Sequence, residues 1–234
     1  MSTTKKIIIT GGTKGIGKAL VEEYSSHGYE VFTCGRSLET LKLLQSIADK
    51  HHNSIHAFQA DLSKKEDCLA FCEWLLDQTN EIDILIHNSG VFIPGNILSE
   101  EDDLFEKTLN LNLRGPYLLN KKLYPLVKNC KGHIILMASV ASEKPFPNCG
   151  TYVASKYALL GYGRVLREIS KEDGVKVTTV MPGATLTASW DGTGVGLDRI
   201  MSPEAIATSI WNLTQLSGNA LVEEITLRPL LGDL

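Results

Sequence analysis

Short apolar runs alternate with longer amphipathic stretches along this chain. The apolar runs are rich in isoleucine, leucine and valine, and several are nearly continuous, which is typical of parallel strands buried on both faces. The predicted strands span residues 6–10, 30–34, 55–59, 82–87, 133–138, 176–181 and 224–227. The predicted helices span residues 16–27, 38–51, 64–79, 100–129, 152–173 and 203–217.

This alternation predicts one α/β domain over residues 1–234, with a doubly wound parallel sheet flanked by helices on both faces. Ligands bind outside the carboxyl ends of the strands in such sheets. Neither an internal repeat nor a Pro/Ser-rich linker divides the chain. Residues 185–201 break the alternation because they are rich in glycine and poor in apolar periodicity. We expect a mobile substrate loop there.

Composition and charge exclude several classes of protein. Of 234 residues, 43% are hydrophobic and 21% charged, which is ordinary for a globular protein. A formal net charge of −4 without a basic block argues against nucleic acid as the main partner. No apolar run approaches the roughly 20 residues that span a bilayer, and the N-terminus lacks a signal-peptide pattern. We expect a soluble cytoplasmic protein that does not bind membranes.

The five cysteines are scattered along the chain. An odd number of cysteines in a chain of this length indicates reduced thiols rather than a disulfide framework. Cys68 and Cys72 could share one helix face, but no histidine or second cysteine pair accompanies them at zinc-site spacing. We therefore expect no metal site.

A glycine-rich turn, Thr10-Gly-Gly-Thr-Lys-Gly-Ile-Gly17, directly follows the first predicted strand. Its glycines, spaced GxxxGxG, permit a tight turn and a close backbone approach, and the next helix offers its N-terminal amides to a pyrophosphate. The alternative is a flexible turn without a ligand, but the position after the first strand favours a dinucleotide. The predicted cofactor-binding residues of this turn are Gly11, Thr13, Lys14, Gly15, Ile16 and Gly17.

The choice between NAD and NADP depends on the end of the second predicted strand. NAD-selective sites usually carry a carboxylate there, which accepts hydrogen bonds from the ribose 2′-hydroxyl. This chain has Arg36 instead, and Lys14 in the glycine turn. Two cations would bind a ribose 2′-phosphate, although both side chains could also be merely solvated. The pattern favours NADP(H).

Polar or small residues also follow the third and fourth predicted strands. Asp61, followed by Leu62, could accept a hydrogen bond from the adenine amino group, or could instead cap the next helix. Asn88 and Gly90 lie where small residues would let the chain pass close to the adenosine. Each signal is weak by itself.

Tyr152 and Lys156 form a YxxxK pair, and Ser139 precedes the tyrosine by thirteen residues. On a helix, positions i and i+4 lie on one face, so the ammonium would favour the phenolate and lower the pKa of Tyr152 below its usual value. Taken singly, Tyr152 could be a packed aromatic, Lys156 a surface cation and Ser139 a helix cap. Their combination downstream of the glycine turn predicts acid/base chemistry.

Taken together, these motifs resemble the ordered series of the short-chain dehydrogenase/reductases over nearly the whole chain. The resemblance implies a Rossmann-type seven-stranded parallel sheet, a nicotinamide cofactor and a homodimer or homotetramer. His87 departs from the family pattern, which usually has asparagine at that position. The residues that carry the resemblance are Thr10–Gly17, Asp61, Asn88–Gly90, Asn112, Ser139, Tyr152, Lys156, Pro182 and Gly183.

The resemblance also assigns a role to each catalytic candidate. Tyr152 would be the general acid or base, and Ser139 would hold the substrate oxygen. Lys156 would lower the phenol pKa and bind the nicotinamide ribose, and Tyr152 would also contact the cofactor. Asn112 would position a water that links Lys156 to solvent, although it could instead be a mid-helix polar group contacting solvent or backbone.

The segment after the sixth predicted strand completes the expected nicotinamide end of the site. Pro182 and Gly183 follow that strand, and Thr185 or Thr187 could reach the carboxamide; Thr187 matches the family spacing Pro-Gly-x-x-x-Thr. His133, at the start of its strand, is expected to be structural.

The substrate is expected to be a small carbonyl or alcohol compound. A weaker resemblance of residues 223–233 to sepiapterin-reductase-like carbonyl reductases suggests a pterin side-chain carbonyl. A 3-oxoacyl thioester reductase and a non-catalytic NADP(H) sensor remain as alternatives.

Overall fold

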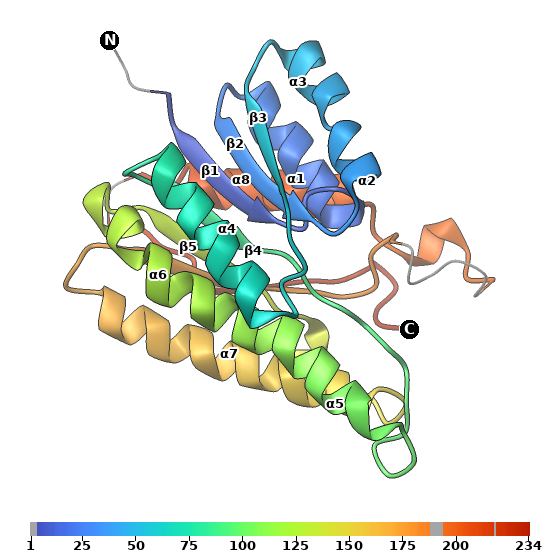
Figure 1. The fold of residues 1–234 in the computed structure, drawn as a ribbon. Helices are drawn as coiled ribbons and strands as arrows, with labels where there is room; N and C mark the ends of the chain where they lie inside the picture. Colours follow the sequence, from blue (N-terminus) through green and yellow to red (C-terminus); the bar gives the residue numbers. More distant parts are fainter. Residues whose placement is uncertain (1–3, 188–193, 218) are drawn as a thin grey trace.

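Seven parallel strands form one sheet in the computed structural model, which describes residues 4–187, 194–217 and 219–234 (Figure 1). The order across the sheet is β3-β2-β1-β4-β5-β6-β7, which confirms the predicted Rossmann-type architecture. Each predicted strand is present, with ends shifted by two residues at most. The strands are β1 (Lys6–Thr10), β2 (Glu30–Gly35), β3 (Ile55–Gln59), β4 (Ile84–His87), β5 (His133–Met137), β6 (Lys176–Pro182) and β7 (Glu224–Leu227).

Helices cover both faces of the sheet. In Figure 1, α4, α6 and α7 lie on one face, and α1 and α8 on the other. The helices are α1 (Gly15–Ser26), α2 (Leu38–Lys42), α3 (Gln45–His51), α4 (Lys65–Gln78), α5 (Asp102–Leu109), α6 (Gly115–Asn129), α7 (Gly150–Ser170) and α8 (Pro203–Thr214). The shorter turns are the π-helical η1 (Asn110–Arg114) and the 3₁₀ turns η2 (Val140–Ser142) and η4 (Leu197–Arg199).

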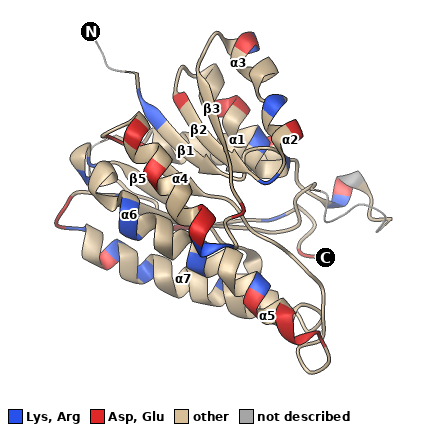
Figure 2. Ribbon diagram, in the orientation of Figure 1, with Lys and Arg blue, Asp and Glu red and all other residues tan. Residues whose placement is uncertain are grey.

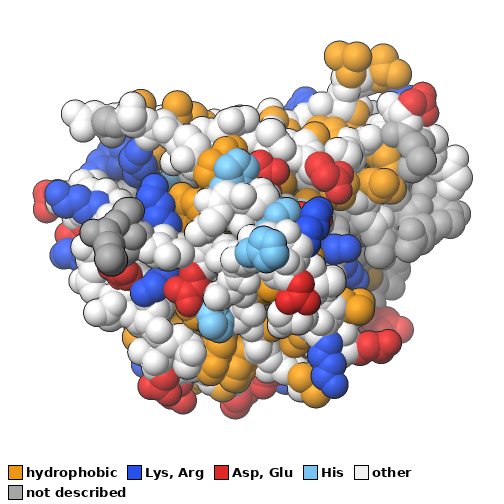
Figure 3. Space-filling model, turned by 90° about the horizontal axis from the view of Figure 1, so that it is seen from above, with side chains coloured by type: hydrophobic (Ala, Val, Ile, Leu, Met, Phe, Trp, Pro, Cys, Tyr) orange, Lys and Arg blue, Asp and Glu red, His pale blue; other side chains and the backbone are white. Residues whose placement is uncertain are grey.

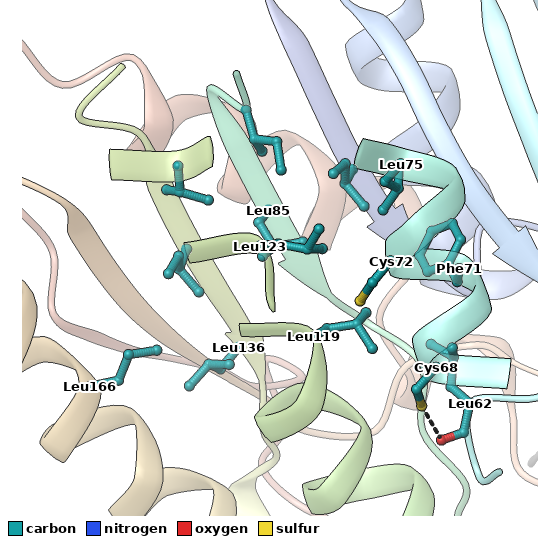
Figure 4. Close-up of a cluster of buried hydrophobic side chains, with 14 of the residues drawn as sticks. Leu62, Cys68, Phe71, Cys72, Leu75, Leu85, Leu119, Leu123, Leu136 and Leu166 are labelled. Carbon is teal, nitrogen blue, oxygen red and sulfur yellow. Dashed lines mark hydrogen bonds between the residues drawn. The ribbon is translucent and has the colours of Figure 1, made fainter. Parts of the chain in front are cut away.

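A large hydrophobic core lies between the sheet and the layer formed by α4, α6 and α7 (Figure 4). Phe71 and Leu75 from α4 contribute to this core together with Leu119 and Leu123 from α6. The Cys68 thiol donates a hydrogen bond to the carbonyl oxygen of Leu62, 3.3 Å away. All five cysteines are free thiols, and all but one are buried.

The prediction of one continuous helix over residues 38–51 is wrong, because the segment divides into two helices, α2 and α3. Leu43 and Leu44, between the two, have ψ near −20°, a value typical of 3₁₀ rather than α geometry. Leu41 and Leu44, on either side of Leu43, are in the core, where they are 6% and 2% exposed.

The helix predicted over residues 100–129 is also interrupted, by the π-helical turn η1 between α5 and α6. Pro116 follows this turn and has no amide N–H, so it cannot continue the i→i−4 hydrogen-bond ladder. A π-turn widens the helix locally and is frequent at functional sites. Asn112, one of the catalytic candidates, lies within it and is buried.

β1 and β4 are neighbours in the sheet although β2 and β3 lie between them in sequence. The chain therefore winds outward in both directions from this pair, and the loops after the two strands diverge at their carboxyl ends. A ligand site is expected at that switch point. The glycine turn after β1 and Asn88 after β4 are the segments found there.

The two ends of the predicted loop of residues 185–201 are hydrogen-bonded to each other. Thr185 and Met201 form an isolated parallel bridge, and the Leu186 amide donates to the Met201 carbonyl oxygen at 2.8 Å. Residues 188–193 of this expected substrate loop lie outside the described residues.

The surface carries acidic and basic side chains interspersed along the ribbon (Figure 2). The face seen from above bears several histidines among charged and neutral side chains (Figure 3). Within the described ranges, no three histidine, cysteine, aspartate or glutamate side chains are grouped so as to hold a metal ion. None of the described helices is long and apolar enough to cross a bilayer.

Candidate active site

The glycine turn has a backbone that requires glycine at several positions. Gly11 and Gly15 have φ of +71° and +52°, in the left-handed region that side chains disfavour. A Cβ atom on Gly17 would lie 2.0 Å from the Gly11 carbonyl oxygen. The turn is therefore as tight as the GxxxGxG spacing predicts.

The side chain of Asn88 faces this turn. Its Nδ2 donates to the carbonyl oxygens of Thr10 and Gly11 at 3.0 and 3.2 Å. The amides of Asn88 and Ser89 in turn donate to the Thr10 hydroxyl. Asn88 thus connects the loop after β4 to the glycine turn after β1, and its hydrogen bonds help to fix the backbone of that turn.

Gly12 and Thr33 also shape the turn, and sequence reasoning missed them. The Gly12 amide donates to Thr33 Oγ1 at 3.1 Å, and that hydroxyl donates to the Ile9 carbonyl oxygen at 2.6 Å. A Cβ on Gly12 would lie 2.3 Å from Thr33 Oγ1. The available signal was a polar threonine within the apolar second strand.

The N-terminus of α1 is open to an anion. Lys14 is the N-cap but provides no side-chain capping bond, and the first turn of α1 has no acidic residue. The amides of the first turn, around Gly15 and Ile16, therefore have no partner from a cap, and the helix dipole favours negative charge there. Thr187 lies against this turn, because a Cβ on Gly15 would be 3.1 Å from Thr187 Cγ2.

Lys14 and Arg36 are both exposed, and neither forms an ion pair with any described residue. The Arg36 backbone is held by Gln59, whose Nε2 donates to the Arg36 carbonyl oxygen at 2.9 Å. Both cations come from loops at the carboxyl ends of β1 and β2, which are adjacent strands. Their charges are available to a phosphate.

Asp61 does not cap α4. Its Oδ1 accepts from the amide and the hydroxyl of Ser63, at 3.1 and 2.7 Å, and the N-cap Lys64 has no side-chain capping bond. The alternative that Asp61 is a helix cap is therefore wrong. Leu62 is buried in the core at 5% exposure, and its carbonyl oxygen accepts from the Cys68 thiol.

Ser139, Tyr152 and Lys156 come together at the carboxyl end of β5. The Lys156 Nζ lies 5.6 Å from the centroid of the Tyr152 ring and donates to the Met137 carbonyl oxygen at 2.7 Å. Ser139 caps η2, accepting from the Ala141 amide at 3.1 Å, and its hydroxyl interacts with the phenol of Tyr152.

The protein alone does not lower the pKa of Tyr152, which Lys156 and the cofactor charge together are expected to do. Burial raises the pKa of Tyr152 to about 12, and the hydrogen bond with Ser139 opposes this only in part. Burial also lowers the pKa of Lys156 to about 8. Desolvation is the main cause of both shifts, and the Lys156 ammonium donates its hydrogen bond to the Met137 carbonyl oxygen.

The Asn112 side chain hydrogen-bonds to the backbone of Val91 and to the hydroxyl of Ser155. Its Oδ1 accepts from the Val91 amide at 2.8 Å, and its Nδ2 donates to the Val91 carbonyl oxygen and to Ser155 Oγ, both at 3.0 Å. Gly90 fits between Asn112 and Lys156, since a Cβ there would lie 3.3 Å from Asn112 Oδ1 and 3.6 Å from Lys156 Nζ. The side chain thus fixes the loop after β4 against α7.

At the expected nicotinamide end, Pro182 is the last residue of β6 and the Gly183 amide donates to the Leu227 carbonyl oxygen at 2.7 Å. The Thr185 hydroxyl donates to the Gly183 carbonyl oxygen at 3.0 Å and is 5% exposed. Thr187 is half-buried against Gly15. Of the two threonines, Thr187 is thus the one that lies beside the glycine turn.

Two histidines are buried outside the catalytic group. His87 Nε2 lies 2.8 Å from Asn120 Oδ1, and Asn120 Nδ2 donates to the Tyr162 hydroxyl at 3.0 Å. His133 Nε2 lies 2.7 Å from Thr178 Oγ1. Burial lowers the pKa of His87 to about 4 and that of His133 to about 3. Both side chains are neutral at physiological pH.

Comparisons with known proteins agree with this architecture. The chain is 29% identical to sepiapterin reductase of Chlorobaculum tepidum over 97% of each chain. The alcohol dehydrogenase of the archaeon Thermococcus sibiricus, complexed with 5-hydroxy-NADP, has the same fold, with a TM-score of 0.89, 24% identity and 97% of each chain covered. A metagenomic short-chain oxidoreductase in complex with NADP has a TM-score of 0.83, with 26% identity and 96% of each chain covered.

The family model for short chain dehydrogenases matches residues 5–194. That range includes the glycine turn, the loop after β4, Ser139 after β5 and the catalytic candidates on α7. On the fold, the site and this match, the chain belongs to the short-chain dehydrogenase family of oxidoreductases.

Proposed function

We propose that this chain is an NADP(H)-dependent oxidoreductase that transfers a hydride between the nicotinamide and a carbonyl or alcohol substrate. The observation that carries the proposal is the grouping of Ser139, Tyr152 and Lys156 at the same end of the sheet as the glycine turn. A half-buried phenol that hydrogen-bonds to a serine and has a lysine ammonium close to its ring is suited to exchange a proton with a substrate oxygen.

The residues around the glycine turn fit a phosphorylated dinucleotide. The uncapped N-terminus of α1 suits a pyrophosphate, and Lys14 and Arg36 suit a ribose 2′-phosphate. Asp61 retains Oδ2 for the adenine amino group, and Thr187 supports the carboxamide end. The NADP complex of the metagenomic relative adds support for this cofactor.

NADPH, when bound, supplies the hydride that is added to the carbonyl carbon. Tyr152 donates its proton to the carbonyl oxygen, because a phenol with a pKa of about 12 is protonated at neutral pH. Ser139 holds that oxygen beside the phenol. Lys156, with a pKa of about 8, is mostly protonated at pH 7 and stabilises the phenolate that Tyr152 becomes. In oxidation, Tyr152 must first lose its own proton, and its phenolate then takes the proton of the alcohol.

Proton resupply to Tyr152 requires a path from solvent past Lys156. We assign that path to Asn112 through a bridging water, since Asn112 Oδ1 and Lys156 Nζ both lie close to Gly90. The Asn112 side chain has used both amide hydrogens on Val91 and Ser155, so Oδ1 or the backbone carbonyl oxygen would hold the water.

The experiment follows NADPH or NADH absorbance with diketones, aldehydes, 3-oxoacyl thioesters and sepiapterin. Turnover that prefers NADPH and disappears in Tyr152→Phe supports the proposal. Tyr157→Phe is the matched control, because Tyr157 is on the same helix but 44% exposed. Tight NADPH binding without turnover of any substrate would favour the sensor instead.

Sepiapterin belongs in the panel because sepiapterin reductase of Chlorobaculum tepidum is similar over nearly the whole chain. Faster turnover of 3-oxoacyl thioesters than of sepiapterin would identify the alternative substrate class.

We further infer that the chain forms a homodimer or homotetramer through η1, α6 and α7. An apolar groove of about 430 Å³ between these helices is lined by Leu109, Leu113, Tyr117, Ala158 and Tyr162, among others. A second copy would bury this groove. Sedimentation as a monomer at micromolar concentration would contradict the inference.

Two further expectations stay predictions. Folding of residues 1–234 as a single domain can be checked by limited proteolysis, and a cytoplasmic location by cell fractionation.

A further inference from the structure

The segment of residues 91–100 connects β4 to α5 and lies along the N-terminal end of the catalytic helix α7. Asn112 holds the first residue of the segment, Val91, through two hydrogen bonds to its backbone. In the middle, the Gly95 amide donates to the Asn148 carbonyl oxygen at 2.7 Å, and Gly95 forms a parallel bridge with Cys149. The segment is therefore attached to the residues that immediately precede α7.

Side chains of this segment also pack on the first turn of α7. A Cβ on Gly150 would lie 2.9 Å from the Cβ of Ile97, so only glycine allows this approach. Phe92 lies edge-on to Tyr152, with ring centroids 5.0 Å apart and an interplanar angle of 87°. The segment thus touches the phenol ring as well as the helix end.

The N-terminus of α7 lacks a cap of its own. Cys149 is the N-cap and makes no side-chain capping bond, and the first turn has no acidic residue. A helix of 21 residues carries partial positive charge and unpaired amides at this end. A carboxylate brought from elsewhere in the chain would stabilise it.

Glu100, the last residue of the segment, supplies that carboxylate. Its Oε1 accepts a hydrogen bond from the hydroxyl of Thr151, which is buried at 2% exposure. Its Oε2 lies 2.9 Å from the position a Cβ would occupy on Gly95. The half-exposed carboxylate thus lies between the segment and the first turn of α7, bonded to the residue that precedes Tyr152.

We propose that Glu100 is a positioning residue for Tyr152, acting through the Thr151 hydroxyl and the N-terminus of α7. This inference rests on the proposed function for its effect on rate. Loss of the contact lets the first turn of α7 move, so the phenol leaves the geometry needed for proton transfer. Displacement of a reacting group by about 1 Å can cost up to roughly 10²-fold in rate.

The test compares Glu100→Gln, Thr151→Val and Thr151→Ser with the wild type, using Glu101→Gln as the matched control on an exposed neighbour. Glu100→Gln and Thr151→Val should each lower kcat about tenfold, while KM for NADPH changes little. Thr151→Ser keeps the hydroxyl and should retain wild-type kcat. The double variant should be no slower than the slower single variant, since both remove one contact.

A second measurement reports on the contact without turnover. Cys149 is 6% exposed at the start of α7, so its alkylation by iodoacetamide, mapped by mass spectrometry, should accelerate severalfold in Glu100→Gln and Thr151→Val. Labelling of Cys34, which is distant in the fold at the end of β2, should not change.

Wild-type kcat in Thr151→Val would overturn the proposal, whatever happens to Cys149. Absence of turnover in the wild type would instead contradict the proposed function. In that case the alkylation of Cys149 still tests the contact between Glu100 and Thr151. An unchanged rate of Cys149 alkylation in both Glu100→Gln and Thr151→Val would overturn the proposal independently.

Discussion

Lowering the pH from 7.5 to 5.0 should cost this protein about 4 kcal/mol of its free energy of unfolding, because two histidines are buried in neutral form. The pKa of His87 is about 4 and that of His133 about 3, against an ordinary value of 6.5. The unfolded chain therefore binds more protons than the folded protein as pH falls below 6.5. Stability is fully present above pH 6.5 and is lost on acidification.

The magnitude follows from proton linkage. At pH 5.0 each unfolded histidine is almost fully protonated, whereas the folded ones are not, so each contributes about 2 kcal/mol of destabilisation. For two protons, the free energy of unfolding changes with pH by up to about 2.7 kcal/mol per pH unit. Glu22 and Glu224, whose pKa values are lowered by Lys50 and Arg164, lose their contributions only below about 4.5. The range above pH 5 therefore isolates the histidines.

Urea unfolding of the wild type, His87→Asn and His133→Gln at pH 7.5, 6.0 and 5.0 measures the effect, at one protein concentration because oligomerisation would add to stability. Each variant loses hydrogen bonds and is expected to be less stable at pH 7.5. The loss between pH 7.5 and 5.0 should nevertheless shrink by about 2 kcal/mol in each. A wild-type loss below about 1 kcal/mol, or an unchanged loss in both variants, would refute the reasoning.

Three further predictions concern the cofactor end and the thiols. Gly17→Ala places a Cβ 2.0 Å from the Gly11 carbonyl oxygen and should weaken NADPH binding more than about tenfold by fluorescence titration, a loss of roughly 1.4 kcal/mol; unchanged affinity would contradict the geometry of the turn. Arg36→Glu should reverse the ratio of kcat/KM for NADPH over NADH, and a ratio that stays above one would show that Arg36 does not read the 2′-phosphate. Burial raises the pKa of Cys34 and Cys72 to about 12, so both should resist iodoacetamide at pH 8 until urea unfolds the protein, and rapid native labelling would contradict their burial.

Periodicity along the chain was enough to predict the sheet. Apolar runs such as Ile7–Ile9 are buried on both faces, and they could be recognised because the apolar pattern of a buried parallel strand is contained in a few adjacent residues. The glycine turn was predictable for the same reason, since Gly11 and Gly15 adopt the positive φ that their residue type allows. The breaks at Leu43 and at η1 were not, because tertiary packing decides where a helix is interrupted.

The site was predictable as a set of residues, but its energetics was not. The i,i+4 spacing of Tyr152 and Lys156 predicted their common face, yet the direction of the Tyr152 pKa shift depended mainly on burial, and Lys156 donates to the Met137 carbonyl oxygen. The contact of Glu100 with Thr151 joins residues 51 positions apart. Local sequence determines which groups are available; desolvation and long-range contacts, which exist only once the segments pack, determine what those groups can do.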